Sequence, residues 1–303
     1  MLQVNTLSFA YDTGSVLEDL NFNVNQGEHV SVIGESGSGK STLLKLLHGE
    51  YDLDQGEIFW KDTQILGPKH NLVVGYEFMK YVSQEFDLMP FTTVAENVGK
   101  FLSNFYPEEK KERIRELLEV VELSEFAHTK VKTLSGGQKQ RVALARAMAK
   151  QPEIILLDEP FSHIDNFQKQ SLRRSVFNYL KNNNITCIVA THDREDVLGF
   201  SDRMLVLNTH KIVVNAAPQD LYKNPKTPLI AAFFGEFNTI ADTIVYAHQL
   251  KRVENSALKA SVVRSYFKGA YYLIEAKTEK QQLFFENAEP IDIGTTIFLE
   301  IKT

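Results

Sequence analysis

The fold of this chain is decided by the stretch Gly34-Glu35-Ser36-Gly37-Ser38-Gly39-Lys40-Ser41. Its glycines and its closing Lys-Ser pair fit the pattern Gly-x4-Gly-Lys-Ser/Thr of a phosphate-binding loop. The apolar run His29–Ile33 precedes the loop, and a helical pattern over Ser41–His48 follows it. A strand before and a helix after are the context in which this loop occurs. The stretch therefore predicts a strand, a glycine-rich turn and a helix that together hold a phosphorylated ligand.

The chemistry of the loop follows from its residue types. Glycines allow successive backbone N–H groups to turn inward, and the next helix presents its positive N-terminus to an anion. Lys40 can reach the β- and γ-phosphates of a nucleotide, and the hydroxyl of Ser41 can ligate Mg²⁺. The alternative is a glycine-rich turn that holds no ligand.

Polar residues follow three apolar, strand-like runs elsewhere in the chain. Asp158 and Glu159 follow Ile154–Leu157, His192 comes soon after Thr186–Ala190, and Gln84 follows Met79–Ser83. Ligands of open α/β sheets gather at the carboxyl ends of strands. Asp158 could hold Mg²⁺, Glu159 could accept a proton from attacking water, and His192 could contact a γ-phosphate. Taken singly, an acidic pair after a strand is usually a solvated turn, a lone histidine is more often structural, and a lone glutamine indicates almost nothing.

A second candidate for anion binding is Leu134-Ser135-Gly136-Gly137-Gln138. It precedes a helical pattern over Gln138–Lys150, so a hydroxyl, two glycine amides and a helix N-terminus come together. The simpler interpretation is that Ser135 caps the helix. A single nucleotide need not use both phosphate-binding elements of one chain.

Composition limits the class of protein. The 303 residues are 43% hydrophobic with a formal net charge of −6, which is normal for a globular chain and unfavourable for general nucleic-acid binding. The single cysteine, Cys187, excludes an internal disulfide framework and a zinc site rich in thiolates. No signal peptide and no apolar run of about 18 residues is apparent, so we expect a soluble, cytoplasmic protein.

The pattern changes near Phe233. Before it, strand-like and helix-like segments alternate, as in α/β proteins. After Asn238 the chain reads as strands, which predicts a small all-β domain. The strand-like segments of this part are Leu258–Arg264, Ala270–Ala276, Gln282–Glu286 and Thr296–Ile301.

These motifs together resemble the ATP-binding cassette (ABC) ATPases, and the resemblance covers residues 1 to about 235. The phosphate loop, Gln84, Leu134–Gln138, Asp158-Glu159 and His192 occur in the family's order, and Leu134–Gln138 matches its signature. The family's D-loop, usually Ser-Ala-Leu-Asp, corresponds to Ser162-His163-Ile164-Asp165. His163 and Ile164 therefore differ from the residues that are usual in the family.

The resemblance implies a P-loop NTPase fold over residues 1–235, a RecA-like core with antiparallel β and helical subdomains, the helical one at about 88–150. It implies ATP and Mg²⁺ as cofactors and a head-to-tail homodimer. Catalytic roles fall to Glu159, His192, Lys40 and Gln84, and the metal ligands are Ser41, Gln84 and Asp158. The nucleotide-binding residues are Tyr11, Gly34, Ser36, Gly37, Ser38, Gly39, Lys40, Ser41, Thr42, Ser135, Gly136, Gly137, Gln138 and Asp165.

Residues 236–303 resemble the transport-associated OB-type (TOBE) domain of binding-protein-dependent importers, through Phe233–Ile240 and Tyr266–Tyr272. The resemblance implies a peripheral subunit on the inner face of the cell membrane. Its implied partners are transmembrane permease subunits and an extracytoplasmic solute-binding protein, without nucleic acid. The substrate stays open, and the wording of Gly235–Ile240 favours iron or a polyamine. The alternatives are the ATPase of an ABC exporter and a soluble ABC ATPase outside transport.

Overall fold

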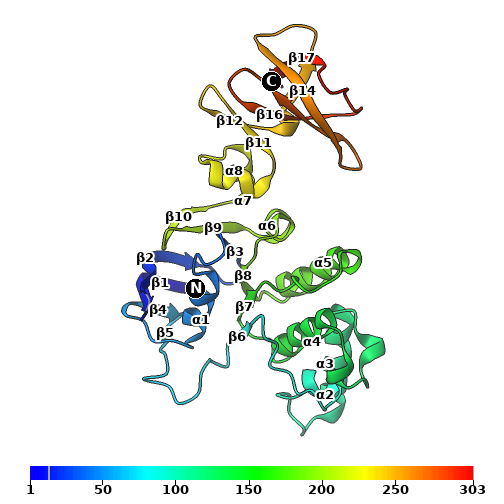
Figure 1. The fold of residues 1–303 in the computed structure, drawn as a ribbon. Coiled ribbons are helices and arrows are strands. Elements are labelled where there is room, and N and C mark those ends of the chain that lie inside the picture. The colour runs from blue at the N-terminus through cyan, green and yellow to red at the C-terminus, as the bar shows by residue number, and fades with distance from the viewer. Residues whose placement is uncertain (13, 303) are drawn as a thin grey trace. The chain divides into compact units, whose positions relative to one another are not determined.

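The computed structural model describes residues 1–12 and 14–302, which form two compact units, 1–218 and 219–303 (Figure 1). The sequence placed the domain boundary at residue 235, inside the second unit. Two short helices, α7 (Pro218–Lys223) and α8 (Pro228–Phe234), precede the strands of that unit. Tyr222 of α7 stacks on Tyr246 with ring centroids 5.1 Å apart and meets Phe234 edge-on at 5.6 Å. These aromatic contacts explain why the helical segment groups with the β-rich part.

A six-stranded sheet forms the centre of the first unit, in the order β10-β9-β3-β8-β7-β6. Five strands are parallel, and β10 pairs antiparallel with β9. All residues of β3, β7 and β8 are buried, as expected for strands covered on both faces. The α/β fold predicted from the sequence is thereby confirmed. The strands are β3 (His29–Ile33), β6 (Met79–Val82), β7 (Ile154–Asp158), β8 (Thr186–Ala190), β9 (Arg203–Asn208) and β10 (Lys211–Ala216).

One face of this sheet packs on α1 (Lys40–His48) and on an antiparallel sheet of order β2-β1-β4-β5. Apolar residues of both sheets and of α1 share one core, in which Trp60 is fully buried. The helix ends at Gly49, whose φ of 78° suits a left-handed C-cap. The strands of the second sheet are β1 (Leu2–Tyr11), β2 (Gly14–Val24), β4 (Gln55–Trp60) and β5 (Thr63–Gln64).

The other face packs on α5 (Asn166–Asn182) and on a mostly helical region. Helix α3 (Pro107–Val120) begins at Pro107, a residue that suits the first turn of a helix. The predicted helix over Gln138–Lys150 is observed as α4 (Gly136–Met148), because Ser135 is its N-cap. The region also holds α2 (Val94–Val98), η1 (Ser124–Phe126) and η2 (Val131–Thr133), and α6 (Arg194–Phe200) follows β8. Across residues 1–12 and 14–302, no helix has the length and apolar character needed to span a membrane.

The second unit is rich in antiparallel strands, so the predicted all-β character of this region is confirmed; its assignment to the OB type stays a prediction. A hairpin of β11 and β12 accompanies a sheet of order β13-β17-β14-β15-β16, whose inward side chains form a separate core. The elements are β11 (Phe237–Ile240), β12 (Thr243–Tyr246), η3 (Ala247–Gln249), β13 (Leu250–Val253), β14 (Leu258–Phe267), β15 (Tyr272–Lys277), β16 (Gln282–Asn287) and β17 (Thr296–Ile301).

Asn238 joins the hairpin to the larger sheet. Its buried amide accepts a hydrogen bond from Phe284 N at 2.7 Å and donates to Phe284 O at 2.8 Å. We expect Asn238→Ala to lower the free energy of unfolding by about 1–3 kcal/mol, because it leaves buried backbone groups without partners. Urea unfolding of the full chain measures the loss, with Thr239→Ala at the neighbouring exposed position as the control. Equal stability of the two variants would contradict the prediction.

Candidate functional site

The phosphate loop has the local geometry that its sequence predicts. Gly37 and Gly39 adopt φ of 81° and 98°, in the left-handed region that favours glycine. A Cβ on Gly34 would lie 2.5 Å from Leu207 O and from Ser38 Oγ. The Nζ of Lys40 donates to the carbonyls of Gly34 and Glu35 at 2.8 and 2.9 Å, which holds the ammonium across the loop. The loop is therefore closely packed at Gly34, and the Lys40 ammonium is hydrogen-bonded to its carbonyls.

A cavity of about 640 Å³ opens above this loop. It collects residues from β1, β2, the loop, α1 and the carboxyl ends of β6, β7 and β8, as expected for open α/β sheets. All but one of its lining residues were predicted from the sequence. Val16, an apolar residue of β2, carries no motif that could have indicated it. The lining comprises Tyr11, Val16, Gly34, Ser36, Gly37, Gly39, Lys40, Ser41, Thr42, Gln84, Glu159 and His192.

Tyr11 lies at the edge of this cavity. Its side chain is 41% exposed, and its hydroxyl lies 3.3 Å from Thr42 Oγ1. Its ring meets Phe9 edge-on with centroids 4.9 Å apart. Tyr11 is thus not a core aromatic of β1, which is the alternative for such a residue. It presents a ring that a planar ligand could contact.

The two carboxylates at the end of β7 have different surroundings. Asp158 is buried, and its Oδ2 accepts a hydrogen bond from the hydroxyl of Tyr81 at 3.2 Å. Burial raises the pKa of Asp158, although hydrogen bonds from Ser41 and Tyr81 oppose this rise. Glu159 is only partly buried and lines the cavity, with a left-handed φ of 49° that is uncommon outside glycine. Asp158 therefore faces Ser41, and Glu159 faces the open space.

His192 completes this side of the cavity. Its Nδ1 lies 3.3 Å from Glu159 Oε1, so the imidazole and the carboxylate are adjacent. Its backbone is fixed by the residues on either side. Thr191 donates to Asp196 at 2.6 Å, and Asp193 caps α6 by accepting from Glu195 N at 3.0 Å. The placement of His192 thus depends on a group of acidic and basic residues behind it.

Arg173 of α5 is the centre of that group. It is buried and forms ion pairs with Asp193 and, at 2.6 Å, with Asp196. Burial raises the pKa of Asp193, but hydrogen bonds from Lys169, the Glu195 amide and Arg173 outweigh burial and lower it to about 2. Nothing in the motif order indicated Arg173, because its partners are near it only in the folded chain.

We expect Asp193→Asn to lower the free energy of unfolding by about 1–2 kcal/mol at pH 7. This is less than the loss for a fully buried pair, because Asp193 is partly exposed and Asp196 still pairs with Arg173. The pKa of Asp193 falls on folding from 3.8 to about 2. Its contribution is therefore complete above about pH 4 and is lost as the pH falls toward 2. Denaturation at several pH values measures it, with exposed Asp62→Asn as the control. A difference that grew below pH 4 would contradict the prediction.

The predicted second anion element lies outside the cavity lining. Ser135 caps α4, since its Oγ accepts from Gln138 N at 3.2 Å and Gln138 Oε1 accepts from Ser135 N at 2.9 Å. The simpler interpretation of this segment is thus present in the structure. Asp165 is the N-cap residue of α5 without a side-chain cap bond. The lining of the cavity includes none of Ser135, Gly136, Gly137, Gln138 or Asp165.

Gln140 connects α4 to the end of β7. Its buried amide donates to Glu159 O at 2.9 Å, and its Oε1 accepts from His163 N at 3.2 Å. The segment Leu134–Gln138 also packs closely on the backbone of His163, because a Cβ on Gly137 would lie 2.6 Å from His163 O. The sequence did not indicate Gln140. It holds the backbone carbonyl of Glu159, whereas His192 lies beside the side chain.

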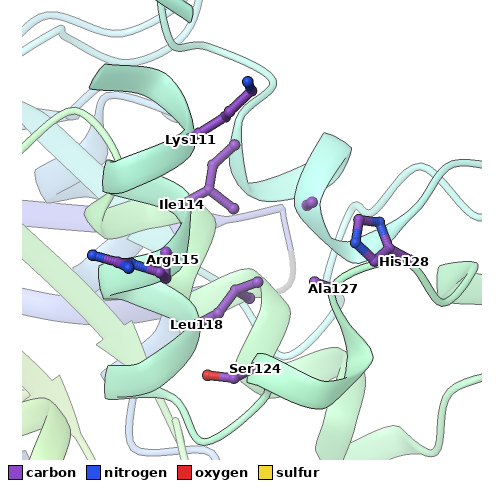
Figure 2. Close-up of a pocket in the computed structure, with 8 residues that line it drawn as sticks. Lys111, Ile114, Arg115, Leu118, Ser124, Ala127 and His128 are labelled. Carbon is purple, nitrogen blue, oxygen red and sulfur yellow. The ribbon is translucent and has the colours of Figure 1, made fainter. Parts of the chain in front are cut away.

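A second cavity, of about 220 Å³, lies between α2, α3 and the η1 segment (Figure 2). Ile114, Leu118 and Ala127 supply an apolar lining, with His128 facing them. The cations at its edge, Lys111 and Arg115, pair with Glu108 and Glu112 on their own helix. No glycine is among its lining residues. The glycine loop that the sequence predicts to bind phosphate lines the larger cavity instead.

The fold and the larger cavity define the class of protein as a P-loop ATPase, with a phosphate loop, a buried Asp and a cavity-facing Glu at adjacent strand ends.

Comparison with known proteins narrows this class. The ABC transporter family matches residues 17–162. The spermidine/putrescine import ATP-binding protein PotA of Pasteurella multocida is 33% identical over 86% of this chain and 69% of its own length. The Fe(3+) ions import ATP-binding protein FbpC 2 of Haemophilus influenzae is 37% identical over 78% of this chain and 67% of its own. A dimeric ATP-binding cassette bound to ADP and Pi superposes with a TM-score of 0.64 at 30% identity, over 72% of this chain and 98% of that one.

The chain belongs to the ABC transporter family. It is an ATP-binding subunit with the ATPase activity that is inherent to this family, as the sequence predicted.

Proposed function

We propose that the cavity above the phosphate loop binds ATP together with Mg²⁺ and hydrolyses it. The observation that supports this most strongly is the convergence of Lys40, Gln84, Glu159 and His192 on one cavity. Ser38 Oγ adds to it, because this hydroxyl of the loop is buried without a hydrogen-bond partner. A buried hydroxyl without a hydrogen-bond partner at a glycine loop is expected where a bound anion accepts its hydrogen bond. Tyr11 would then stack on the adenine, beside Thr42.

In this proposal each cavity residue has a defined task. Lys40 neutralises charge on the β- and γ-phosphates, and the loop amides hold the phosphate oxygens. Glu159 orients the attacking water and accepts its proton, which is why its carboxylate faces the open space. His192 donates a hydrogen bond to the γ-phosphate and is held beside Glu159. Gln84 contributes a side-chain amide that contacts the same water.

Ser41 and Asp158, with Gln84, would hold Mg²⁺ and so help to neutralise the phosphates. The residues fit this ion, because Mg²⁺ in nucleotide sites binds one or two carboxylates and the substrate's own phosphates. The carboxylate of Asp158 already contacts Ser41.

We propose further that Ser135–Gln138 and Asp165 serve the site of a second copy of this chain. These residues lie outside the cavity of their own subunit, yet Ser135, Gly136 and Gly137 are at least partly exposed at a helix N-terminus. In a head-to-tail dimer they would cover the nucleotide of the partner. The structural relative that is bound to ADP and Pi is itself dimeric.

The function we propose for the whole system is import of a solute through separate membrane subunits, powered by this ATPase. The names of the relatives support this, because both are import ATP-binding proteins, one for spermidine and putrescine and one for Fe(3+). Both solutes are cationic, so we propose a cationic substrate. Its delivery would require an extracytoplasmic solute-binding protein, and the membrane passage would be formed by permease subunits.

Purification of the tagged chain from the membranes of its source organism tests this proposal. We expect integral membrane subunits to co-purify with the chain. Vesicles that contain the reconstituted complex should take up spermidine, putrescine or Fe³⁺ only when ATP is present on the side of the membrane where the ATPase subunit lies. Complexes assembled with Lys40→Ala serve as the control and should not transport. Co-purification of nucleic acid without membrane subunits would contradict the proposal.

A further inference from the structure

Tyr81 makes a contact that the cavity residues do not explain. It lies on the edge strand β6, and its half-buried ring packs against His48 with centroids 5.5 Å apart. Its hydroxyl donates to Asp158 Oδ2 at 3.2 Å. Tyr81 does not line the larger cavity itself. It therefore contacts the carboxylate from outside the lining of that cavity.

The surroundings of Asp158 make this contact important. Asp158 is 3% exposed, so water has little access to its carboxylate. The orientation of the carboxylate therefore depends on hydrogen bonds from protein groups. Its two side-chain hydrogen-bond donors are Ser41, which faces the cavity, and Tyr81. Of these two donors, Ser41 belongs to α1 beside the phosphate loop, and Tyr81 is the one that comes from another strand of the sheet.

The packing of Tyr81 favours one orientation of its hydroxyl. The ring is half-buried on β6, and the neighbouring strand β7 ends at Asp158. The ring itself is held by His48, whose Nδ1 lies 3.3 Å from Glu50 Oε1. The orientation of the hydroxyl thus follows from packing rather than from the ligand.

We propose that Tyr81 is a positioning residue that holds the Asp158 carboxylate in the orientation that binds Mg²⁺. Groups that hydrogen-bond to a metal ligand orient it, and their loss weakens metal affinity on the order of 10-fold or more. The inference rests on the proposed role of Asp158 as a Mg²⁺ ligand. Tyr81 of the edge strand β6 would then affect metal affinity, although it belongs to none of the sequence motifs.

The test is Tyr81→Phe, which keeps the ring on His48 and removes only the hydroxyl. Binding of a fluorescent ATP analogue is titrated with Mg²⁺ in the Glu159→Gln background, so that turnover does not intervene. We expect the half-saturating Mg²⁺ concentration to rise on the order of 10-fold, and analogue binding in EDTA to stay unchanged. An unchanged Mg²⁺ requirement, or an equal loss of binding in EDTA, would overturn the proposal.

Two further variants make the outcome specific. Tyr76→Phe is the matched control, because it removes a hydroxyl that accepts from Leu66 N at 2.8 Å and does not contact Asp158. Its Mg²⁺ requirement should equal that of the parent. Asp158→Asn should abolish the Mg²⁺ dependence of binding. If Asp158→Asn left that dependence intact, the proposed metal site would fail, whereas failure of Tyr81→Phe alone would remove only the positioning role.

Discussion

Replacing Glu159 with Gln is expected to slow ATP hydrolysis by about 10²–10⁴-fold, the contribution typical of a general base. The amide keeps the size of the side chain and its place beside His192, but it cannot accept the proton of the attacking water. Because Lys40 and the loop amides are untouched, ATP binding should persist. A closed dimer that holds unreacted ATP should therefore accumulate. Phosphate release and size-exclusion chromatography with ATP measure the two effects.

Glu153→Gln is the matched control for this prediction. Glu153 precedes β7, at the opposite end of the strand from Glu159, where its carboxylate pairs with Lys61 at 2.6 Å and accepts from Trp60 at 2.8 Å. We expect its hydrolysis rate to stay close to that of the parent. Parent-like hydrolysis in Glu159→Gln would exclude Glu159 as the base, and His192 would then be the next candidate.

Lys40→Ala is expected to lower ATP affinity by about 100-fold or more, the range for removing one partner of a desolvated charge pair. Burial lowers the pKa of Lys40, although the charges of Glu159 and Asp158 oppose this. A half-buried ammonium beside two carboxylates is exchanged for a methyl group, so the phosphates would meet uncompensated negative charge. Equilibrium binding of ATP measures the loss.

Lys45→Ala controls for the loss of a lysine from the same helix. The ammonium of Lys45 lies 5.8 Å from the ring centre of Tyr51 and does not line the cavity. Its removal should change ATP affinity by less than about 3-fold, as expected for a partly exposed charge. If both variants bound ATP equally well, Lys40 would not be the phosphate contact.

The parts of the site that lie within one continuous segment could be predicted from the sequence. The phosphate loop is one such segment, and β3 and β8 begin and end where the apolar runs predict. These runs are reliable because strands buried on both faces leave no room for polar residues. Asp158, Glu159 and His192 follow such strands, so one rule about strand ends is enough to predict that they lie together.

The contacts that support the site could not be predicted in this way. Tyr81, Gln140 and Arg173 each act on a residue of another segment, and neither spacing nor residue type reveals the partner. The stacking of Tyr222 on Tyr246 is a further contact of this kind, because it joins a helix to a strand that follows later in the chain. The role of Ser135 toward a second subunit stays a prediction, since within one chain its visible task is to cap α4.

That cap has a consequence for the energetics of association. A serine hydroxyl offers one hydrogen and two lone pairs, and the bond from Gln138 N occupies a lone pair only. The hydrogen stays available for a phosphate oxygen, while the rotamer is already selected during folding of the subunit. Ordering such a side chain at an interface otherwise costs about 0.5–1.5 kcal/mol of entropy. Because Ser135 is ordered before association, this entropy would not be lost each time a dimer closes. The free energy of closing would then depend mainly on the contacts with the nucleotide.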